Sequence, residues 1–281
     1  MTNPRPLIEP VADLLRETAQ SLILPKWGRL KDDEKAHKAG GEIVTQVDQA
    51  TEVFLTKRLK RLISNSFVVG EEAVSEDPLV LDALQTDNPV WIVDPIDGTA
   101  HFAAGRDRFG ILVALSIGDQ VQAAWVYHVV ADRLYWAVRG QGAYRNNRQL
   151  TAAAERRAHS DIRPITYLGF LPEAHRAHVK QAVSAFAPNK SGYCAAYDYP
   201  EVITGARGLL LAYRVRPWDH APGSLLAEEA GAVVRKFDGA AYRPSDATPG
   251  LLVAPDQESW VRYQGLFVPP EFRNPGPFQE P

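Results

Sequence analysis

The chain has 281 residues, which suits one large domain or two closely joined halves around a substantial core. Apolar residues make up 45% and charged residues 23%, as in most globular proteins, and a formal net charge of −3 gives no basic footprint for nucleic acid. A single cysteine, Cys194, excludes an intrachain disulfide and fits a reducing compartment. The N-terminal segment carries acidic residues, unlike a signal peptide, and no apolar run approaches the roughly 20 residues that span a bilayer. We therefore expect a cytoplasmic protein with neither a nucleic acid nor a membrane as partner.

The first half of the chain mixes helical and strand-like spacing of apolar residues. In chain order, the pattern predicts a helix over 7–23, a charged loop over 31–41, and an extended segment from residue 42 that becomes a helix near Thr45–Asp48 and ends near Ile63. It then predicts short buried strands over 66–73 and 88–98, a hairpin over 109–130 that turns at Gly118-Asp119, and a further strand pair over 133–150. Both short buried strands finish in acidic residues.

The second half reads as α/β. In chain order, we expect a strand within 162–170, a helix over 172–186, a strand over 208–215, a helix over 221–231 that ends at Gly231, and an irregular Pro-rich tail over 268–281. Strands dominate the middle of the chain, which favours an α+β arrangement of layered sheets and helices over a regular Rossmann alternation. We expect two halves, 1–150 and 151–281, that form one compact unit.

Carboxylates gather where predicted strands end. They are Glu71 and Glu72 in "FVVGEE", Asp94 and Asp97 in "VWIVDPID", Asp219 in "LLLAYRVRPWD", and, further upstream, Asp48 in "VTQVD". Charges at the ends of buried strands are costly unless they are paired or bind a metal ion. Singly, each has a plainer explanation as a solvated loop, a turn or a helix cap. Together they indicate an all-oxygen site that suits Mg²⁺, Mn²⁺ or Ca²⁺ rather than zinc.

The tripeptide Asp97-Gly98-Thr99 carries information beyond its charge. Gly98 allows an unusual backbone angle and the close approach of a ligand. Backbone N–H groups at the start of a following helix bind an anion such as phosphate, and Thr99 adds a hydroxyl beside them. Metal ligands and an anion cradle within six residues are what metal-assisted phosphoryl transfer to water requires.

These motifs resemble those of the inositol monophosphatase family. The resemblance covers roughly residues 8–260 and is carried by "GEE" (70–72), "DPIDGT" (94–99) and "WDHAPG" (218–223), with "VTQVD" (44–48) upstream. It implies a layered αβαβα sandwich of the inositol monophosphatase and fructose-1,6-bisphosphatase type. It also implies an Mg²⁺-dependent, lithium-sensitive phosphomonoesterase that uses two to three ions, with Mn²⁺ as a substitute, and a homodimer.

The same resemblance implies a role for each matched residue. Glu71, Asp94 and the backbone carbonyl of Ile96 would bind the first cation, and Asp94, Asp97 and Asp219 would bind the second. Glu71 and Glu72 would lie near a weaker third cation and its waters. Thr99 with Asp48 would orient the attacking water, and the amides of Gly98 and Thr99 would hold the phosphate. Every carboxylate that the family motifs require is therefore present in this sequence.

The substrate side departs from the family pattern. Inositol-directed members carry an acidic residue seven positions before the last metal-ligating aspartate, and this chain has Ala212 there, followed by Arg214 and Arg216. His220 and His101 are also unusual at their positions. We therefore hypothesise a substrate with an added anionic or aromatic group, bound near Ala212, Arg214, Arg216 and His220. The alternative is that the arginines are solvated edge residues.

Other functions compete with this interpretation. The same centre could act on histidinol phosphate, a nucleotide 3′-phosphate or fructose bisphosphate, and a non-catalytic family member could use the metal site for binding alone. A glycosidase with paired acids would explain the carboxylates but not Gly98-Thr99.

Overall fold

The computed structural model describes residues 4–31, 34–37, 43–153, 158–187 and 194–276. The helical segments are η1 (Arg5–Leu7), α1 (Ile8–Thr18), η2 (Ala19–Ile23), α2 (Gln46–Leu62), α3 (Glu71–Glu76), η4 (Pro78–Gln85), α4 (Thr99–Ala103), η5 (His159–Asp161), α5 (Glu173–Val183), α6 (Ala195–Ile203), α7 (Pro217–Glu229), α8 (Gln257–Phe267) and η6 (Pro270–Phe272). The strands are β1 (Lys35–His37), β2 (Ile43–Thr45), β3 (Phe67–Gly70), β4 (Val90–Asp97), β5 (Gly110–Ile117), β6 (Gln120–His128), β7 (Arg133–Val138), β8 (Ala143–Arg145), β9 (Arg148–Leu150), β10 (Pro164–Thr166), β11 (Leu209–Ala212), β12 (Val233–Lys236) and β13 (Leu251–Ala254).

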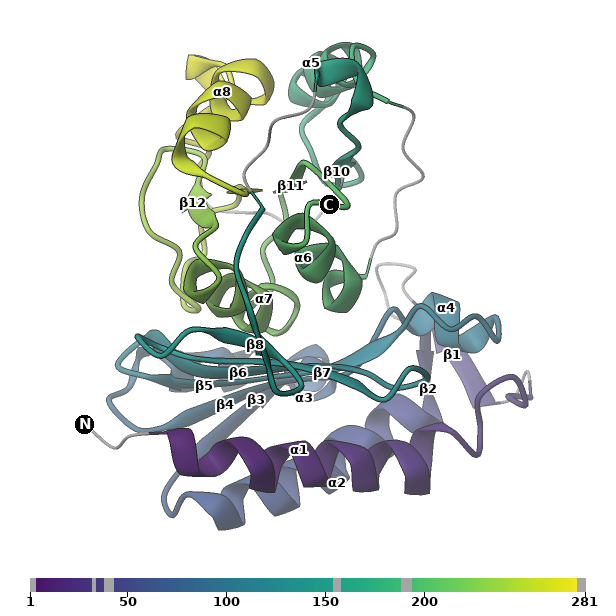
Figure 1. Cartoon of the computed structure of the whole chain (residues 1–281). Helices are drawn as coiled ribbons and strands as arrows, with labels where there is room; N and C mark the ends of the chain where they lie inside the picture. The colour runs from purple at the N-terminus through teal and green to yellow at the C-terminus, as the bar shows by residue number, and fades with distance from the viewer. Residues whose placement is uncertain (1–3, 32–33, 38–42, 154–157, 188–193, 277–281) are drawn as a thin grey trace.

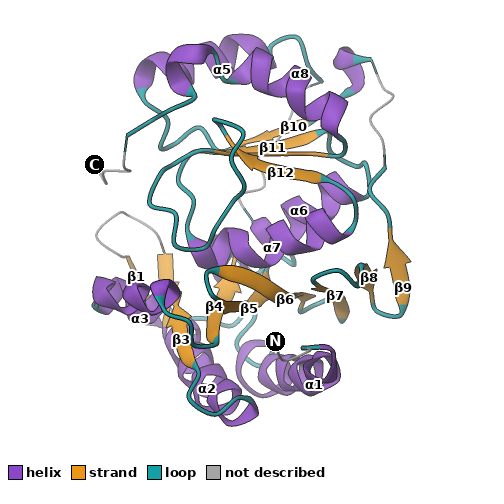
Figure 2. Cartoon of the chain, turned by 90° about the vertical axis from the view of Figure 1, so that its left-hand side faces the viewer, coloured by secondary structure: helices purple, strands orange, loops and turns teal. Residues whose placement is uncertain are grey.

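These elements stack in alternating layers. A seven-stranded sheet has the order β3-β4-β5-β6-β7-β8-β9, and a four-stranded sheet has the order β10-β11-β13-β12. Helices α1 and α2 cover the outer face of the larger sheet, α6 and α7 lie between the sheets, and α5 and α8 cover the smaller sheet (Figures 1 and 2). This αβαβα arrangement confirms the predicted fold.

Strand β4 shows why its sequence is apolar without interruption. Trp91 and Val93 pack in the core under α1 and α2, whereas Val90 and Ile92 pack in the core that α6 and α7 share with the sheet. Side chains alternate between the two faces of a strand, so a strand covered on both sides needs apolar residues at every position.

Strand β11 repeats this division in the smaller sheet. Leu209 and Leu211 face the outer core beneath α5 and α8, whereas Leu210 and Ala212 face the middle helical layer. The middle layer therefore packs against apolar faces of both sheets, and it fixes how they stand relative to each other.

The pairing of β3 and β4 places the acidic segments at one edge. The two strands run parallel, with Phe67 opposite Val90 and Gly70 opposite Val93. Their carboxyl ends therefore meet, so Glu71 after β3 lies near the carboxylates that end β4.

Several expected elements differ in extent. The sequence predicts a loop over 31–41, but the described part contains β1, which pairs with β2. The segment 133–150 forms three strands rather than two. Helix α7 begins at Pro217 instead of near residue 221, because proline suits the first helical turn. Among the described residues, we find no helix with both the length and the apolar character needed to cross a membrane.

Gly223 allows α6 and α7 to pack closely. A Cβ atom at this position of α7 would lie 2.2 Å from Cδ2 of Tyr199 on α6. We expect Gly223→Ala to lower the free energy of unfolding by about 1–3 kcal/mol, because neither buried helix has room to move. Gly265→Ala is the matched control in α8, where no atom lies within 4 Å of the added Cβ. It should raise stability by about 0.5–1 kcal/mol. Urea unfolding measures both, and equal effects would contradict this packing argument.

Candidate active site

A bulge in β4 brings Asp94 and Asp97 to the same face of the sheet. Asp94 lies opposite Leu112 of β5 and Asp97 lies opposite Gly110, so three steps on β4 match two steps on β5. In a regular strand, residues three apart point to opposite faces, and one extra residue reverses this. Proline at position 95 suits a bulge, because it has no N–H to donate to the ladder. Both carboxylates consequently face the middle helical layer.

Asp219 completes a cluster from the other half of the chain. It lies in the first turn of α7, in the middle layer. Carboxylate oxygens of Asp94, Asp97 and Asp219 all lie within 4.8 Å of one another. Asp94 and Asp97 are buried, and Asp219 is half-buried. The structure thus brings together three of the predicted ligands from two distant segments.

The cluster is electrostatically expensive without a counter-ion. Burial, followed by the charges of Glu71, Asp97 and Asp219, raises the pKa of Asp94 well above its usual value. Burial also raises the pKa of Asp97 to about 6, although hydrogen bonds oppose the shift. Three converging carboxylates with no cationic side chain among them fit a divalent cation, and their all-oxygen donor set suits Mg²⁺ or Mn²⁺. The carbonyl of Ile96, a further predicted ligand, belongs to the bulge between them.

Thr99 and Asp48 form the predicted pair beside this cluster. The Thr99 hydroxyl lies 3.0 Å from Oδ1 of Asp48 and 2.9 Å from the carbonyl of Ile96. The other oxygen of Asp48 accepts the backbone N–H of Thr45 in the capping box that starts α2. Burial raises the pKa of Asp48 to about 7, with these hydrogen bonds acting against the shift. A carboxylate of this kind is suited to accept a proton near neutral pH.

Gly98 turns the chain from β4 into α4. Its φ of 85° lies in the left-handed region that favours glycine, and a Cβ atom would lie 2.8 Å from the carbonyl of Arg108. Its own carbonyl accepts the N–H of His101 and so begins the helix. The first amides of a helix have no acceptor within it. The turn therefore places the first N–H groups of α4, which have no acceptor within the helix, next to Asp97.

A buried glutamate holds the segment that follows β3. Glu71 and Glu72 open α3, and the carboxylate of Glu52 on α2 accepts the N–H groups of Glu72 and Ala73, both at 2.8 Å. Gly70 leaves room for this contact, because a Cβ there would lie 2.2 Å from the carboxyl carbon of Glu52. Burial raises the pKa of Glu52 to about 7, although these amides oppose the shift. The orientation of α3, and with it of Glu71, depends on this contact.

Helix α6 holds Asp97 in a comparable way. The Cys194 thiol lies 3.0 Å from Oδ2 of Asp97, and the N–H of Ala196 donates to the same oxygen at 2.6 Å. Gly110 of β5 lets the helix come this close, because a Cβ there would lie 2.8 Å from that of Ala196. Cys194 is fully buried, as its small apolar neighbours suggest.

Sequence reasoning missed both supporting residues. Glu52 had a signal, because it lies four residues after Asp48 and so shares its face of α2. Cys194 had none, because its contact with Asp97 joins residues 97 positions apart.

Two predicted substrate residues lie inside the protein. Ala212 is fully buried in β11, and its side chain packs in the core. His220 is 1% exposed, and its Nδ1 lies 2.9 Å from the hydroxyl of Tyr199. Burial lowers the pKa of His220 to about 4, against a hydrogen bond to the backbone of Arg214. Both side chains pack in the interior, so their burial does not favour direct contact with a substrate.

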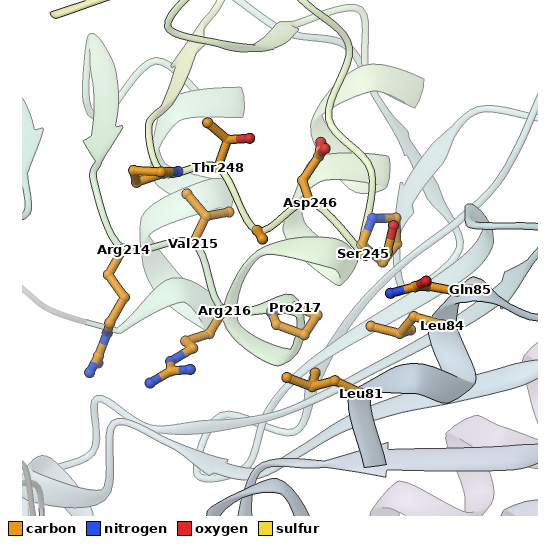
Figure 3. Close-up of a pocket in the computed structure, with 13 residues that line it drawn as sticks. Leu81, Leu84, Gln85, Arg214, Val215, Arg216, Pro217, Ser245, Asp246 and Thr248 are labelled. Atoms are coloured by element: carbon orange, nitrogen blue, oxygen red, sulfur yellow. The ribbon is translucent and has the colours of Figure 1, made fainter. Parts of the chain in front are cut away.

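Arg214 and Arg216 lie at the edge of a cavity. The cavity has a volume of about 280 Å³ and is bounded by the segment before α7, the loop over 244–249 and the end of η4 (Figure 3). Pro217, which lines the cavity, is the first residue of α7, and Asp219 lies in the same first turn. The cavity and the carboxylate cluster therefore share the start of this helix.

Comparisons with known proteins agree with this geometry. The model of the inositol monophosphatase family matches residues 4–265. The inositol-1-monophosphatase of Bacillus subtilis is 27% identical over 241 residues, which make up 85% of this chain and 88% of the relative. The protein named Nus factor SuhB of Escherichia coli K12 is 28% identical over 225 residues, or 79% of this chain and 82% of the relative.

Solved structures share the fold over nearly the whole chain. The inositol monophosphatase II of Staphylococcus aureus MSSA476 superposes with a TM-score of 0.77 at 25% identity, covering 95% of this chain and 94% of the other. The layered fold and the acidic cluster at the carboxyl end of β4 agree with the family match. With a match that extends from residue 4 to residue 265, this chain belongs to the inositol monophosphatase family.

Proposed function

We propose that this protein is a Mg²⁺-dependent phosphatase that hydrolyses a small phosphomonoester. The observation that carries the proposal is the placement of the Thr99–Asp48 pair next to three converging carboxylates. A metal-binding site alone would not need a hydroxyl linked to a buried acid whose pKa lies near 7.

The cation ligands would be those of the cluster and its surroundings. Asp94, Asp97 and Asp219 would bind one cation, and Glu71 with Asp94 and the carbonyl of Ile96 would bind another. Bound divalent cations would supply charge neutralisation and would make a water acidic enough to react at neutral pH. Glu72 lies beside Glu71 at the start of α3, where it would hold further water molecules.

The Thr99 hydroxyl would orient the attacking water. Its oxygen accepts a hydrogen bond from the water while its proton points at Oδ1 of Asp48, 3.0 Å away. As the water attacks phosphorus, its proton passes to Oγ1 of Thr99 and the Thr99 proton passes to Asp48. The raised pKa of Asp48 suits it to receive that proton.

The phosphate would bind where β4 turns into α4. The backbone N–H groups of Gly98 and Thr99 suit phosphate oxygens, and the left-handed backbone of Gly98 keeps this approach open. The P–O bond to the substrate breaks as the water oxygen bonds to phosphorus, and the leaving alkoxide takes a proton from solvent. Hydrolysis then releases inorganic phosphate and an alcohol.

Several finer properties stay predictions. The family resemblance implies inhibition by lithium, activity with Mn²⁺, two to three cations per site and a homodimer, whereas the composition of the sequence implies a cytoplasmic location and no nucleic-acid partner. Phosphate-release assays with each ion, calorimetric titration of the cation and light scattering would measure the first four.

The same chemistry would also suit other substrates, which are histidinol phosphate, a nucleotide 3′-phosphate and fructose bisphosphate.

A different function is binding without catalysis, and the similarity to relatives named Nus factor SuhB is the observation that favours it. Against it stands the complete set of carboxylates, together with the Thr99–Asp48 contact. Well-folded protein that released no phosphate with any divalent cation would support binding alone.

Neutralising a cluster ligand should remove activity without unfolding the chain. We expect Asp94→Asn and Asp219→Asn to lower kcat/KM at least about a hundredfold, because the cations supply several kcal/mol of transition-state stabilisation. Asp13→Asn, on the exposed face of α1, is the control and should be unchanged. Phosphate release and direct titration with Mn²⁺ measure the effects. Near-normal turnover in either cluster variant would show that the ligand assignment is wrong.

The cation-free protein should lose stability as pH rises from about 4 to about 7. The pKa values of Asp48 and Glu52 are raised to about 7 and that of Asp97 to about 6. In this window the folded state keeps protons on these carboxylates that the unfolded chain has released, which lowers the free energy of unfolding as pH rises. His128 and His220 contribute in the opposite direction, because burial lowers their pKa values to about 4. The carboxylate shifts are together the larger, so the free energy of unfolding falls on balance. Thermal unfolding with EDTA measures this trend, and saturating Mg²⁺ should weaken it by binding the ionised carboxylates. Stability that rose with pH in EDTA would contradict it.

Cys194 should affect cation affinity through Asp97. We expect Cys194→Ala to raise the Mn²⁺ dissociation constant by about tenfold, because it removes a donor that orients a ligand. Cys194→Ser keeps a donor at the same place and should stay within about twofold of the parent. Calorimetric titration measures both, and equal losses in the two variants would assign Cys194 to packing alone.

A further inference from the structure

Two arginines follow β11 on the same side of the chain. Arg214 and Arg216 flank Val215 in the segment that leads into α7, and all three line the cavity described above. In extended backbone, residues two apart point the same way. Figure 3 shows both side chains extending in one direction from this segment.

Each guanidinium lies over an aromatic ring. The central carbon of Arg214 is 3.9 Å from the centre of the Phe170 ring, and that of Arg216 is 5.6 Å from the centre of the Trp218 ring. A guanidinium over an aromatic ring is held there by cation–π attraction, and its N–H groups match a carboxylate or a phosphate. The rings thereby help to position both cationic groups.

Buried contacts also fix the backbone beneath them. His220 is buried on α7 and hydrogen bonds to the backbone of Arg214 and to the hydroxyl of Tyr199. Arg216 is the N-cap of α7. The interior position of His220 therefore has a consequence at the surface, because it helps to hold the arginine segment in place.

The residues that line the cavity include two arginines and one acidic residue, Asp246. The carboxylate of Asp246 lies 3.3 Å from Nζ of Lys236 and accepts the backbone N–H of Arg243, so these two residues hold it in place. The remaining wall is largely apolar, with Leu81 and Leu84 of η4 among its residues.

The arginine segment lies close to the proposed cation site. Arg216 is the N-cap of α7 and Asp219 lies three residues further on, in its first turn. The N-cap residue and the third helical residue lie one turn apart at the start of a helix, which is the spacing of a capping box. The arginine segment and the proposed cation site therefore meet at the start of α7.

We propose that Arg214 and Arg216 form a subsite for a second anionic group on the substrate. The preferred substrates are phosphomonoesters whose carbon skeleton also carries a carboxylate or a further phosphate, with the skeleton against the apolar wall of the cavity. This inference rests on the proposed phosphatase function. The competing explanation is that the arginines offset the acidic cluster, in which case they would affect all substrates alike.

A series of matched substrates separates the two explanations. The probes are ω-phosphonooxy carboxylic acids with one to four methylene groups and their uncharged carboxamides, assayed with Mg²⁺. The parent protein should hydrolyse at least one acid with a kcat/KM about tenfold or more above that of its amide, as expected for charge-assisted hydrogen bonds. Because binding is the step affected, the difference should appear mainly in KM.

The variants locate the preference. Arg214→Gln and Arg216→Gln should each reduce the ratio of acid to amide toward one, because kcat/KM falls more for the acids than for the amides. Arg216→Lys should retain part of the ratio, because it keeps the charge without the planar fork. Arg148→Gln, on exposed β9, is the control and should leave the ratio unchanged.

Each other outcome has a distinct meaning. Hydrolysis of acids and amides at equal rates for every length would overturn the subsite and leave the phosphatase proposal intact. Equal losses on acids and amides in both glutamine variants would also overturn it, in favour of charge compensation. No hydrolysis of any probe by folded protein with Mg²⁺ or Mn²⁺ would overturn the phosphatase proposal and the subsite together.

Discussion

Repulsion between buried carboxylates is the constraint around which this structure is organised. Carboxylate oxygens of Asp94, Asp97 and Asp219 converge to within 4.8 Å of one another, in a place where burial already penalises charge. Such a cluster is tolerated only if the surrounding backbone prevents the side chains from turning away. The bulge in β4 and the first turn of α7 do this from opposite sides, because one belongs to a sheet and the other to the helical layer that packs on it.

The surrounding helices stabilise the acids that lie around the cluster with their own backbone. The amino end of α6 donates to Asp97, the amino end of α3 donates to Glu52, and the capping box of α2 donates to Asp48. Helix amino ends carry partial positive charge and unsatisfied N–H groups, so they suit buried carboxylates. Asp94 differs, because within the described residues its side chain accepts only the local amide of Ile96. It is the position where a cation has the most to neutralise.

Much of this arrangement follows from the sequence, and the rest depends on contacts between distant segments. The apolar run before Asp94 predicts a doubly buried strand, and acids at the ends of separate strands predict a shared edge. Helix α6 was not predicted, because it contains Pro200 and begins within a short run of small residues. The contact of Cys194 with Asp97 was equally inaccessible, since it exists only once α6 has packed against β5. Burial of Ala212 and His220 likewise depends on how the middle layer packs, which no local pattern encodes.

The cavity next to the cation site is built from different segments than the site itself. Its walls come from the end of η4, the stretch over 214–217 and the loop over 244–249, whereas the clustered aspartates come from β4 and the first turn of α7. Pro217 of the cavity and Asp219 of the cluster both belong to the first turn of α7, where the two sets of segments meet. Under the proposed function, reaction and recognition would depend on largely separate parts of this fold. Substitutions in the cavity segments would then redirect the chain to another phosphate ester during divergence while the acidic edge stays the same.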